Sequence, residues 1–337
     1  AILASGEKGT PILGVMETSD VAEIVLFDDT DFGNGARSFT ELITHNDSDF
    51  ESVAVNPSDL STICYTSGTT GHPKGAMQSH QSVLMNAAMT AQMHVRTAAD
   101  TIVTALPCPH VYGNVIMNGV MLYGMTLVLH ATFVEDEILN SIERYQATMF
   151  EGVPTMYMYL LNHAKLDKTN LSSLTRCSVG GQTMPVAKME EVETRFGCPL
   201  IELWGMTELA GLGTTHPHYG HNVLGSIGIA LPYTEMRIAA VDDAAKTLPA
   251  GEVGELMARG PLVMQGYYGN DRATAETIED DGWLHTGDLA SMNENGYIFI
   301  VDRKKDLILT AGYNVYPAEL ERVIAAHPAV ALVAVGP

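Results

Sequence analysis

A run of hydroxyl side chains and glycines that ends in one lysine is the strongest chemical signal in the sequence. The run is Tyr65-Thr-Ser-Gly-Thr-Thr-Gly-His-Pro-Lys-Gly75. Glycines let a backbone approach a ligand closely, N–H groups and hydroxyls can donate to phosphate oxygens, and Lys74 can neutralise charge. The pattern therefore predicts a loop that wraps a polyphosphate. A flexible surface loop, the alternative, would not explain why the single cation lies among so many hydroxyls.

This loop differs from the Walker A motif of P-loop proteins. Pro73 stands five residues after Gly68, where the Walker A pattern has its second glycine. Lys74 is followed by Gly75 instead of Ser or Thr. The segment is therefore expected to hold phosphate with a loop of another kind.

The elements around the loop alternate between strands and helices, which indicates an α/β architecture with a mainly parallel sheet. We expect strands over residues 62–65, 126–129 and 200–203, and helices that begin near Ser79, Asn114 and Pro185. Gly197 is a typical stop for the last of these helices. The first helix is expected to bury one face, which consists of Val83, Leu84, Ala87, Ala88 and Ala91.

The C-terminal part of the chain has a different pattern. Residues 225–267 are rich in Gly, Pro and β-branched residues, which is typical of a small β subdomain. A strand over 297–301 leads into the charged segment 302–306. A hairpin-like piece over 307–314 follows, and then a helix opened by Pro317 with Leu320, Val323 and Ile324 on one side. We expect a large domain over 1–302 and the start of a small mobile α+β domain over 303–337, with a hinge near Lys305.

Composition excludes several classes of function. Lys and Arg total 18 against 40 Asp and Glu, which leaves a formal net charge of −22. Such an acidic surface repels polyanions, so nucleic acid is not an expected partner. Only 17% of the residues are charged and 46% are hydrophobic, which argues against disorder. The composition leaves a homo-oligomer open.

The compartment and the completeness of the chain can also be inferred. The four cysteines form no CxxC pair, which favours thiols in a reducing compartment. The uncharged segment 101–134 is broken by Pro and Gly, so no transmembrane segment is expected. We expect a soluble cytoplasmic protein, with peripheral membrane association left open. Both termini fall within apparent structure, so we expect a fragment truncated at both ends.

Five motifs, taken in order, carry a resemblance to a known family. The run 65–75 resembles the phosphate loop of the adenylate-forming superfamily, which includes acyl-CoA synthetases, firefly luciferase and peptide-synthetase adenylation domains. Gly180-Gly-Gln-Thr-Met-Pro185 resembles its adenine-binding segment, and Leu203-Trp-Gly-Met-Thr-Glu208 its aromatic-Gly-Met-Thr-Glu motif. Gly282-Trp-Leu-His-Thr-Gly-Asp288 resembles the ribose-binding segment, and residues 296–319 resemble the hinge and the loop after it. The resemblance covers residue 59 to the end and implies the adenylate-forming fold.

The resemblance implies a role for each matched position. Trp204 would stack on adenine, where most relatives have Tyr. Thr207 would donate to the α-phosphate, and Glu208 would ligate Mg²⁺, which prefers oxygen ligands. Asp288 would accept hydrogen bonds from the ribose hydroxyls, and Arg303 would donate to the ribose or phosphate side. The implied ATP and CoA contacts are Thr66, Ser67, Gly68, Thr69, Thr70, Gly71, Lys74, Gly180, Gly181, Gln182, Trp204, Gly205, Met206, Thr207, Asp288, Ile300, Arg303 and Gly312.

The implied catalytic set is Lys74, His110, Thr207 and Glu208. His110 matches the family's His beside the substrate carboxylate, and Gly312 matches the loop that reaches the tunnel of the thiol acceptor. The residues alone allow plainer roles. A histidine near an apolar helix is more often a satisfied core residue, and a lone Asp at a turn is usually a cap. The cluster His216, His218 and His221 lacks a completing Cys or acid, so a zinc site there is not favoured.

The implied reaction has two steps, with ATP, Mg²⁺ and coenzyme A. A carboxylate attacks the α-phosphorus of ATP to form an acyl-adenylate, and a thiol then takes the acyl group and releases AMP. The segments 110–115, 180–181 and 209–213 would line the acyl pocket, and they contain no Lys or Arg for a second carboxylate. This favours a medium- or long-chain fatty acid over malonate, with an aryl acid as the alternative.

Other functions stay open at this point. One is an adenylation domain that loads a carrier protein, another a non-catalytic nucleotide-binding relative, and a third a luciferase-like oxygenase. The family also uses a lysine from the distal part of its C-terminal domain, for which the chain offers no position. We therefore expect this chain alone to bind ATP but to adenylate poorly.

Overall fold

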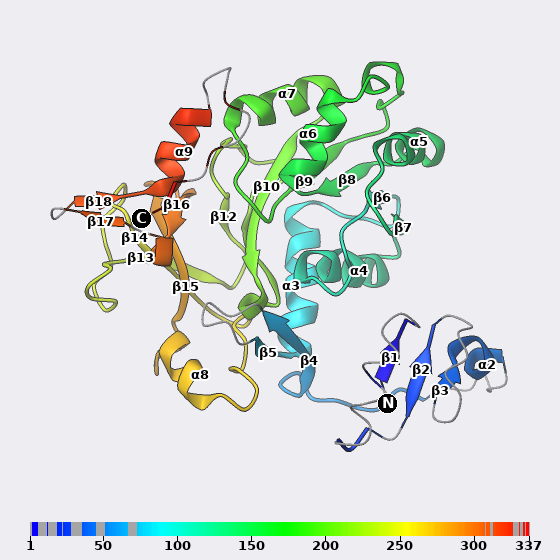
Figure 1. Ribbon diagram of the computed structural model, residues 1–337, viewed down its shortest axis with the longest axis horizontal. Coiled ribbons are helices and arrows are strands. Elements are labelled where there is room, and N and C mark those ends of the chain that lie inside the picture. The colour runs from blue at the N-terminus through cyan, green and yellow to red at the C-terminus, as the bar shows by residue number, and fades with distance from the viewer. Residues whose placement is uncertain are drawn as a thin grey trace. The chain divides into compact units, whose positions relative to one another are not determined.

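The computed structural model in Figure 1 describes residues 2–5, 12, 19–21, 23–27, 36–44, 51–66, 73–306, 308–310, 313–325, 330, 333, 335 and 336. The chain divides into two compact units, residues 1–55 and 56–337. The first unit contains a parallel sheet of β1 (Ile2–Ala4), β2 (Ile24–Leu26) and β3 (Ala36–Ser38), followed by helix α2 (Phe39–Thr44). Its described core is small and includes Ala4, Ile24 and Leu26.

The second unit is built on a seven-stranded sheet in the order β12-β11-β10-β9-β8-β6-β7. Five strands run parallel: β6 (Thr101–Thr104), β7 (Thr126–Leu129), β8 (Met149–Gly152), β9 (Arg176–Val179) and β10 (Leu200–Met206). Two antiparallel strands, β11 (Gly211–Thr215) and β12 (Ile229–Ala230), extend the edge beside β10. The predicted α/β architecture with a mainly parallel sheet is confirmed.

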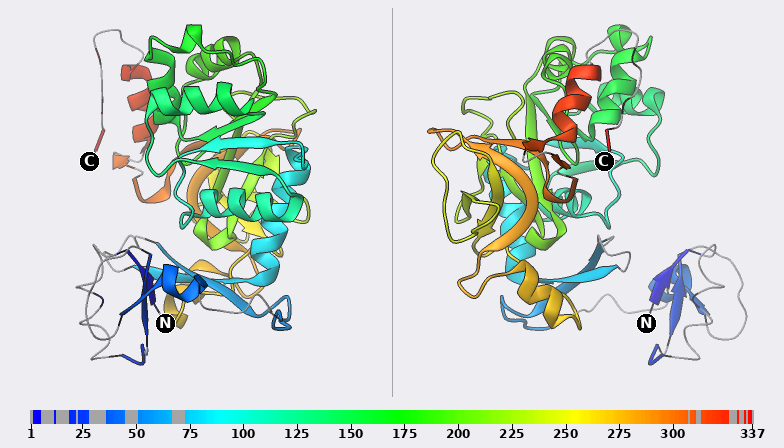
Figure 2. Two further views of the ribbon diagram at one scale, coloured as in Figure 1. Left: turned by 90° about the vertical axis from the view of Figure 1, so that its right-hand side faces the viewer. Right: turned by 60° about the vertical axis from the view of Figure 1, so that its left-hand side comes forward.

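Helices cover both faces of this sheet (Figures 1 and 2). They are α3 (His80–Met93) and α4 (Val111–Tyr123) on one face, and α5 (Glu135–Tyr145), α6 (Pro154–Asn162) and α7 (Val186–Phe196) on the other. The short 3₁₀ turn η1 (Leu166–Lys168) follows α6. Neighbouring strand residues point to opposite faces, so Ile102 belongs to the core under α4 and Val103 to the core under α5. A sheet buried on both faces explains the apolar runs of its strands.

Local signals place the helix ends where the sequence indicates them. Ser79 caps α3, because its hydroxyl accepts from the Ser82 N–H at 3.0 Å. Gly197 ends α7 with a φ of 73°, in the left-handed conformation that glycine adopts without strain. The helix predicted from Asn114 begins earlier, at Val111, with His110 as its cap.

The predicted buried face of α3 was partly wrong. Leu84 is 46% exposed, whereas Ser82, Asn86 and Thr90 are fully buried. The buried face of the helix differs from the predicted one because Asn86 makes hydrogen bonds to the backbone of Leu209 and Leu212, as described below. Polar side chains therefore share the inward face with Val83, Ala87 and Ala91, which are buried as predicted, and Leu84 faces outward.

The small β subdomain is also present. A four-stranded antiparallel sheet joins β13 (Glu235–Ala239), β14 (Gly254–Arg259), β15 (Leu284–Met292) and β16 (Ile298–Arg303). Helix α8 (Asp271–Thr277) precedes β15, and the turn η3 (Lys304–Asp306) follows β16. The hinge predicted near Lys305 falls in this turn and stays a prediction, as does the domain division at 302/303. Within the described residues, no helix combines the length and apolar character that a membrane crossing requires.

The last described elements are the hairpin β17 (Ile308–Thr310) and β18 (Tyr313–Val315) and the helix α9 (Pro317–Ala325). The predicted hairpin and the Pro-opened helix are confirmed in these residues. Leu320, Val323 and Ile324 are 42%, 66% and 41% exposed. The strand predicted near the C-terminus lies mostly outside the described residues.

Glu202 of β10 makes a pH-dependent contribution to stability. Its side chain is 4% exposed, and its Oε2 lacks a hydrogen-bond partner in the described part of the chain. Burial raises the pKa of Glu202 from 4.5 to about 8. Between these values the folded chain holds a proton that the unfolded chain has lost, so stability falls as pH rises.

We expect Glu202→Gln to flatten the pH dependence of the unfolding free energy between pH 5 and 8, by up to about 1.4 kcal/mol per pH unit. The measurement is urea denaturation at a series of pH values. Glu190→Gln, at an exposed position of α7, is the matched control and should leave the slope unchanged. Equal slopes in Glu202→Gln and the parent chain would contradict this assignment.

Candidate nucleotide site

The predicted site residues gather where the parallel strands end. β9 leads directly into Gly180, and β10 leads into the 3₁₀ turn η2 (Thr207–Leu209). The segment after β6 leads to His110 at the start of α4. Open α/β sheets bind ligands outside the carboxyl ends of their strands. The topology therefore brings three separate motifs to one edge of the sheet.

Lys74 lies at the loop end of an antiparallel hairpin. The hairpin consists of β4 (Leu60–Thr66) and β5 (Lys74–Ser79), with Thr66 paired to Lys74. The loop between them carries Ser67, Gly68, Thr69, Thr70 and Gly71, which lie outside the described residues. The backbone on both sides of the loop is thus placed, and with it the side chain of Lys74.

A third stretch of backbone pairs with β5 and brings Tyr267 to Lys74. The Met77 N–H donates to Gly266 O at 2.9 Å, and the Tyr268 N–H donates to Gly75 O at 2.8 Å. Ala76 and Tyr267 form an antiparallel bridge. The Lys74 Nζ consequently lies 5.0 Å from the centroid of the Tyr267 ring, within the range of a cation–π interaction.

The same tyrosine contacts Glu208, the predicted magnesium ligand. Its hydroxyl donates to Glu208 Oε1 at 2.7 Å, and both side chains are buried. Burial and the charge of Glu208 raise the pKa of Tyr267, so the phenol keeps its proton and acts as the donor. Tyr267 thus contacts Lys74 through its ring and Glu208 through its hydroxyl.

Glutamine and backbone contacts hold the turn that carries Thr207 and Glu208. Gln78 of β5, 2% exposed, donates from Nε2 to Thr207 O at 2.8 Å. The Met264 N–H donates to Glu208 O, also at 2.8 Å. The turn is therefore tied both to the hairpin of Lys74 and to the segment that leads to Tyr267.

Asn86 holds the backbone that follows this turn. Its Nδ2 donates to Leu209 O at 3.0 Å and to Leu212 O at 2.8 Å, and its Oδ1 accepts from the Leu212 N–H at 3.1 Å. Within the turn, Ala210 has a φ of 55°, which is strained for a residue with a Cβ. A buried amide with three bonds to one turn explains how that conformation is kept.

A second group joins the two sheets. Trp204 Nε1 of β10 donates to Asp288 Oδ2 of β15 at 2.8 Å, and Arg303 Nε lies 2.8 Å from Asp288 Oδ1. Asp288 is 3% exposed. Burial raises the pKa of Asp288, although Arg303 and the Trp204 N–H oppose the shift. The structure therefore brings together the residues predicted for adenine and ribose.

The backbone near Trp204 needs glycine where the chains approach closely. A Cβ on Gly205 would lie 2.1 Å from Gly211 O, in the bulge between β10 and β11. A Cβ on Gly180 would lie 2.2 Å from Leu203 Cδ1. Gln182 is exposed, whereas Met206 and Ile300 are partly buried. These segments can therefore present bare backbone beside the indole.

One ring nitrogen of His110 is held by the backbone at the start of α4. Its Nδ1 accepts from the Tyr112 N–H at 3.3 Å, so the proton of the neutral ring is on Nε2. Partial burial lowers the pKa of His110, which favours that neutral form. Of the remaining predicted residues, Gly312 lies outside the described residues, and for Lys305 only the backbone is described.

Other polar clusters have structural roles. His216 Nε2 lies 3.0 Å from Ser226 Oγ, and its Nδ1 lies 3.2 Å from Glu202 O. Among the described residues, no group of three or more His, Cys, Asp or Glu side chains could hold a metal ion.

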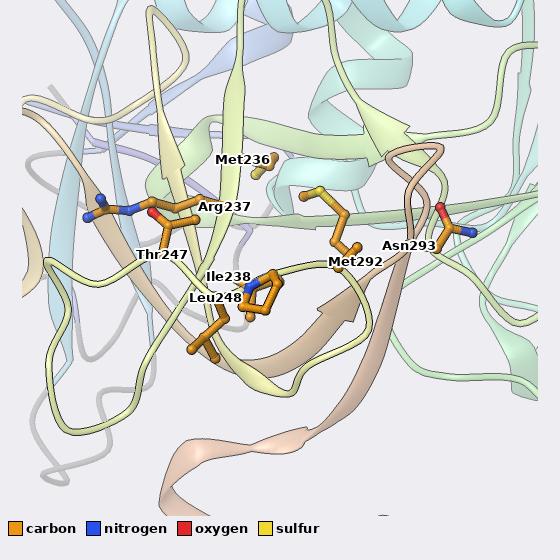
Figure 3. A pocket seen from close by; sticks show the side chains of 9 residues that line it. Met236, Arg237, Ile238, Thr247, Leu248, Met292 and Asn293 are labelled. Atoms are coloured by element: carbon orange, nitrogen blue, oxygen red, sulfur yellow. The ribbon is translucent and has the colours of Figure 1, made fainter.

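A hollow of about 140 Å³ lies on the small β subdomain (Figure 3) and contains none of the predicted site residues. It is lined by Met236, Arg237, Ile238, Thr247, Leu248, Pro249, Ala250, Met292 and Asn293.

Comparison with known proteins identifies the family. The family described as AMP-binding enzyme matches residues 5–268. The chain belongs to this family. A long-chain-fatty-acid–CoA ligase of Bacillus subtilis is 37% identical over 275 residues, which are 81% of this chain and 49% of that protein. An indoleacetate–CoA ligase of Aromatoleum aromaticum is 36% identical over 283 residues, 83% of this chain and 55% of that protein.

Solved structures of AMP-binding enzymes share the fold. ATP-bound MatB from Rhodopseudomonas palustris aligns with a TM-score of 0.89 and 30% identity, over 99% of this chain and 65% of that chain. The Bacillus subtilis o-succinylbenzoate CoA synthetase MenE, in complex with ATP and magnesium, aligns with a TM-score of 0.83 and 32% identity. The alignment covers 97% of this chain and 69% of that chain. The fold is that of an α/β adenylate-forming enzyme. The chain spans about half the length of the curated relatives it matches.

Sequence reasoning missed three residues of the site, Gln78, Asn86 and Tyr267. Asn86 had a detectable signal, because Ser82, Asn86 and Thr90 recur every four residues on one helix face. Gln78 and Tyr267 had none, since each lies in an ordinary strand or loop. Their roles depend on partners far away in the chain, Thr207 and Glu208.

We expect Asn86→Ala to lower the unfolding free energy by roughly 2–4 kcal/mol, because it leaves buried N–H and C=O groups of the 209–212 turn unpaired. Urea denaturation measures the change. Leu84→Ala on the exposed face of the same helix is the control and should cost less than about 1 kcal/mol. A cost for Asn86→Ala no larger than that of the control would show that the turn does not depend on the amide.

Proposed function

We propose that the protein to which these residues belong activates a carboxylic acid with ATP and transfers the acyl group to coenzyme A. The observation that carries this proposal is the meeting of Lys74 and Glu208 on Tyr267, at the carboxyl edge of the sheet of an AMP-binding enzyme. A cation and a buried carboxylate at the mouth of a hydroxyl-rich loop suit a triphosphate and its magnesium ion.

The nucleotide would lie across the two groups described above. Its β- and γ-phosphates would contact the loop 66–71 and Lys74, and Thr207 would donate to the α-phosphate. The adenine would stack on Trp204 beside the backbone of 180–182. Asp288 would accept from the ribose hydroxyls while Arg303 and the indole N–H hold its two oxygens.

Glu208 is suited to hold magnesium. It offers a buried carboxylate, a hard oxygen donor, in contact with the Tyr267 hydroxyl. Magnesium bound there would offset phosphate charge as the substrate carboxylate approaches. His110 would donate from Nε2 to that carboxylate and orient it, and no base is needed because the acid is already ionised.

The first step joins a carboxylate oxygen to the α-phosphorus and breaks the bond to pyrophosphate. Lys74 and Thr207 would donate hydrogen bonds to the charged oxygens of the phosphates. In the second step the CoA thiolate attacks the acyl carbon, and AMP leaves. The relatives include a MenE structure in complex with an acyl-adenylate intermediate, which supports this order for the family.

The acyl substrate we propose is a medium- or long-chain fatty acid. The segments 110–115, 180–181 and 209–213 contain no Lys or Arg, and most of their residues are buried and small or apolar. The 37% identity with a long-chain-fatty-acid–CoA ligase supports the same choice. An aryl acid is the second candidate, favoured by the 36% identity with an indoleacetate–CoA ligase.

We expect Lys74→Ala and Glu208→Gln each to weaken MgATP binding roughly 10- to 100-fold, because each removes a charge-assisted contact. Isothermal titration calorimetry of the 337-residue chain measures this, and circular dichroism checks the fold. Lys188→Ala, at a half-exposed lysine of α7, is the matched control. Unchanged MgATP affinity in both site variants would reject the proposed site.

The substrate test is a panel of fatty, aryl and dicarboxylic acids, with AMP release measured with and without CoA. We use the native polypeptide that contains these residues. Fastest CoA-dependent release with medium- or long-chain fatty acids supports the proposal. Preference for aryl acids selects the second candidate. Adenylation that is not completed by CoA indicates a carrier-protein acceptor, and ATP binding without AMP release indicates a non-catalytic relative.

A further inference from the structure

Tyr267 stands between two opposite charges that are both needed by the proposed nucleotide site. Its hydroxyl contacts Glu208 and its ring lies beneath Lys74, at 2.7 Å and 5.0 Å respectively. The side chain is only 6% exposed. Lys74 and Glu208 both contact this phenol, and the ion pairs found among the described residues do not include a pair between them.

The backbone on both sides of Tyr267 fixes the position of its ring. The bridge to Ala76 ties it to β5, and its N–H donates to Thr274 Oγ1 of α8 at 2.9 Å. Gly266 lies so close to Thr274 that a Cβ there would be 2.8 Å from Thr274 Cγ2. A ring placed by β5 and α8 together has little freedom to leave the space between Lys74 and Glu208.

Direct contact between these two charges would compete with the nucleotide. Opposite unit charges in contact near a protein surface attract one another more strongly than they do in bulk water. A lysine paired with Glu208 would be less available to phosphate, and the carboxylate would be less available to a cation. The ring offers the ammonium its π face, a weaker partner that phosphate can replace.

We propose that Tyr267 is a positioning residue that keeps Lys74 and Glu208 apart and orients the carboxylate for magnesium. This inference rests on the proposed function, since it assigns a role within the same nucleotide site. The hydroxyl holds Oε1 of Glu208, and groups that orient a metal ligand in this way commonly alter metal affinity 10- to 100-fold when removed. The ring holds the Lys74 ammonium by a cation–π contact. The two roles belong to different atoms and can be separated by mutation.

Tyr267→Phe removes only the hydroxyl, and Tyr267→Leu removes the hydroxyl and the ring. We expect Tyr267→Phe to raise the magnesium concentration that half-saturates ATP binding about 10-fold, with metal-free ATP affinity unchanged. Tyr267→Leu should also weaken metal-free ATP binding about 10-fold, because Lys74 is then drawn to Glu208. Calorimetric titration with ATP, at zero and at varied magnesium, measures both quantities. Tyr268→Phe, at the neighbouring tyrosine that is 60% exposed, is the control and should match the parent.

A double variant tests the spacer role directly. If Tyr267→Leu weakens metal-free binding through a new ion pair, then Glu208→Gln in that background removes the competing charge and should restore most of the lost affinity. A simple packing defect would not be rescued in this way. The proposal is overturned if Tyr267→Phe leaves the magnesium dependence within twofold of the parent, or if Glu208→Gln fails to rescue Tyr267→Leu.

The Phe variant keeps the packing of the ring, so it remains informative if Tyr267→Leu does not fold. The outcomes also separate this inference from the function itself. Loss of MgATP binding in Lys74→Ala and Glu208→Gln, with a normal Tyr267→Phe, would leave the nucleotide site in place and reject only the role of Tyr267. Unchanged binding in all of these variants would reject the nucleotide site as well.

Discussion

The pairing of residues 264–268 with β5 is the contact on which the geometry of the site depends. It joins the hairpin of Lys74 to a segment almost 200 residues later in the sequence, and it places the Tyr267 hydroxyl against Glu208. Without it, the hairpin and the η2 turn would share only the bond from Gln78 among the side-chain contacts described above. The Lys74 ammonium and the Glu208 carboxylate thereby contact the ring and the hydroxyl of the same tyrosine. This arrangement suits the site that we propose for a metal-bound triphosphate.

A second constraint is the junction of the two sheets. Trp204 belongs to the seven-stranded sheet, whereas Asp288 and Arg303 are paired on neighbouring strands of the four-stranded sheet. The indole N–H crosses this junction to reach the carboxylate. A tyrosine at this position would have no N–H at that point of its ring. The indole of Trp204 thus gives this chain a hydrogen bond between the two sheets.

Some of the structure could be predicted from local patterns, and some could not. Gly197 and Ser79 mark helix ends because caps act on backbone groups a few residues away. The face of α3 was predicted in part wrongly, since Leu84 is exposed and Asn86 buried. Counting apolar residues could not predict that backbone groups of Leu209 and Leu212, at the start of β11, bind the Asn86 amide. The motifs 203–208 and 282–288 indicated Trp204 and Asp288 separately, but not that they bond to one another.

The sequence by itself determined the alternation of strands and helices, the phosphate-loop motif and the family, because these depend on short-range periodicity and on residue types at fixed spacing. Only the tertiary structure decided that Tyr267 lies between Lys74 and Glu208, that Gln78 and Asn86 hold the η2 turn, and that Trp204 reaches Asp288. The physical reason is distance along the chain. These contacts join residues 59 to 193 positions apart in the sequence, and no local pattern specifies which distant backbone will meet which side chain.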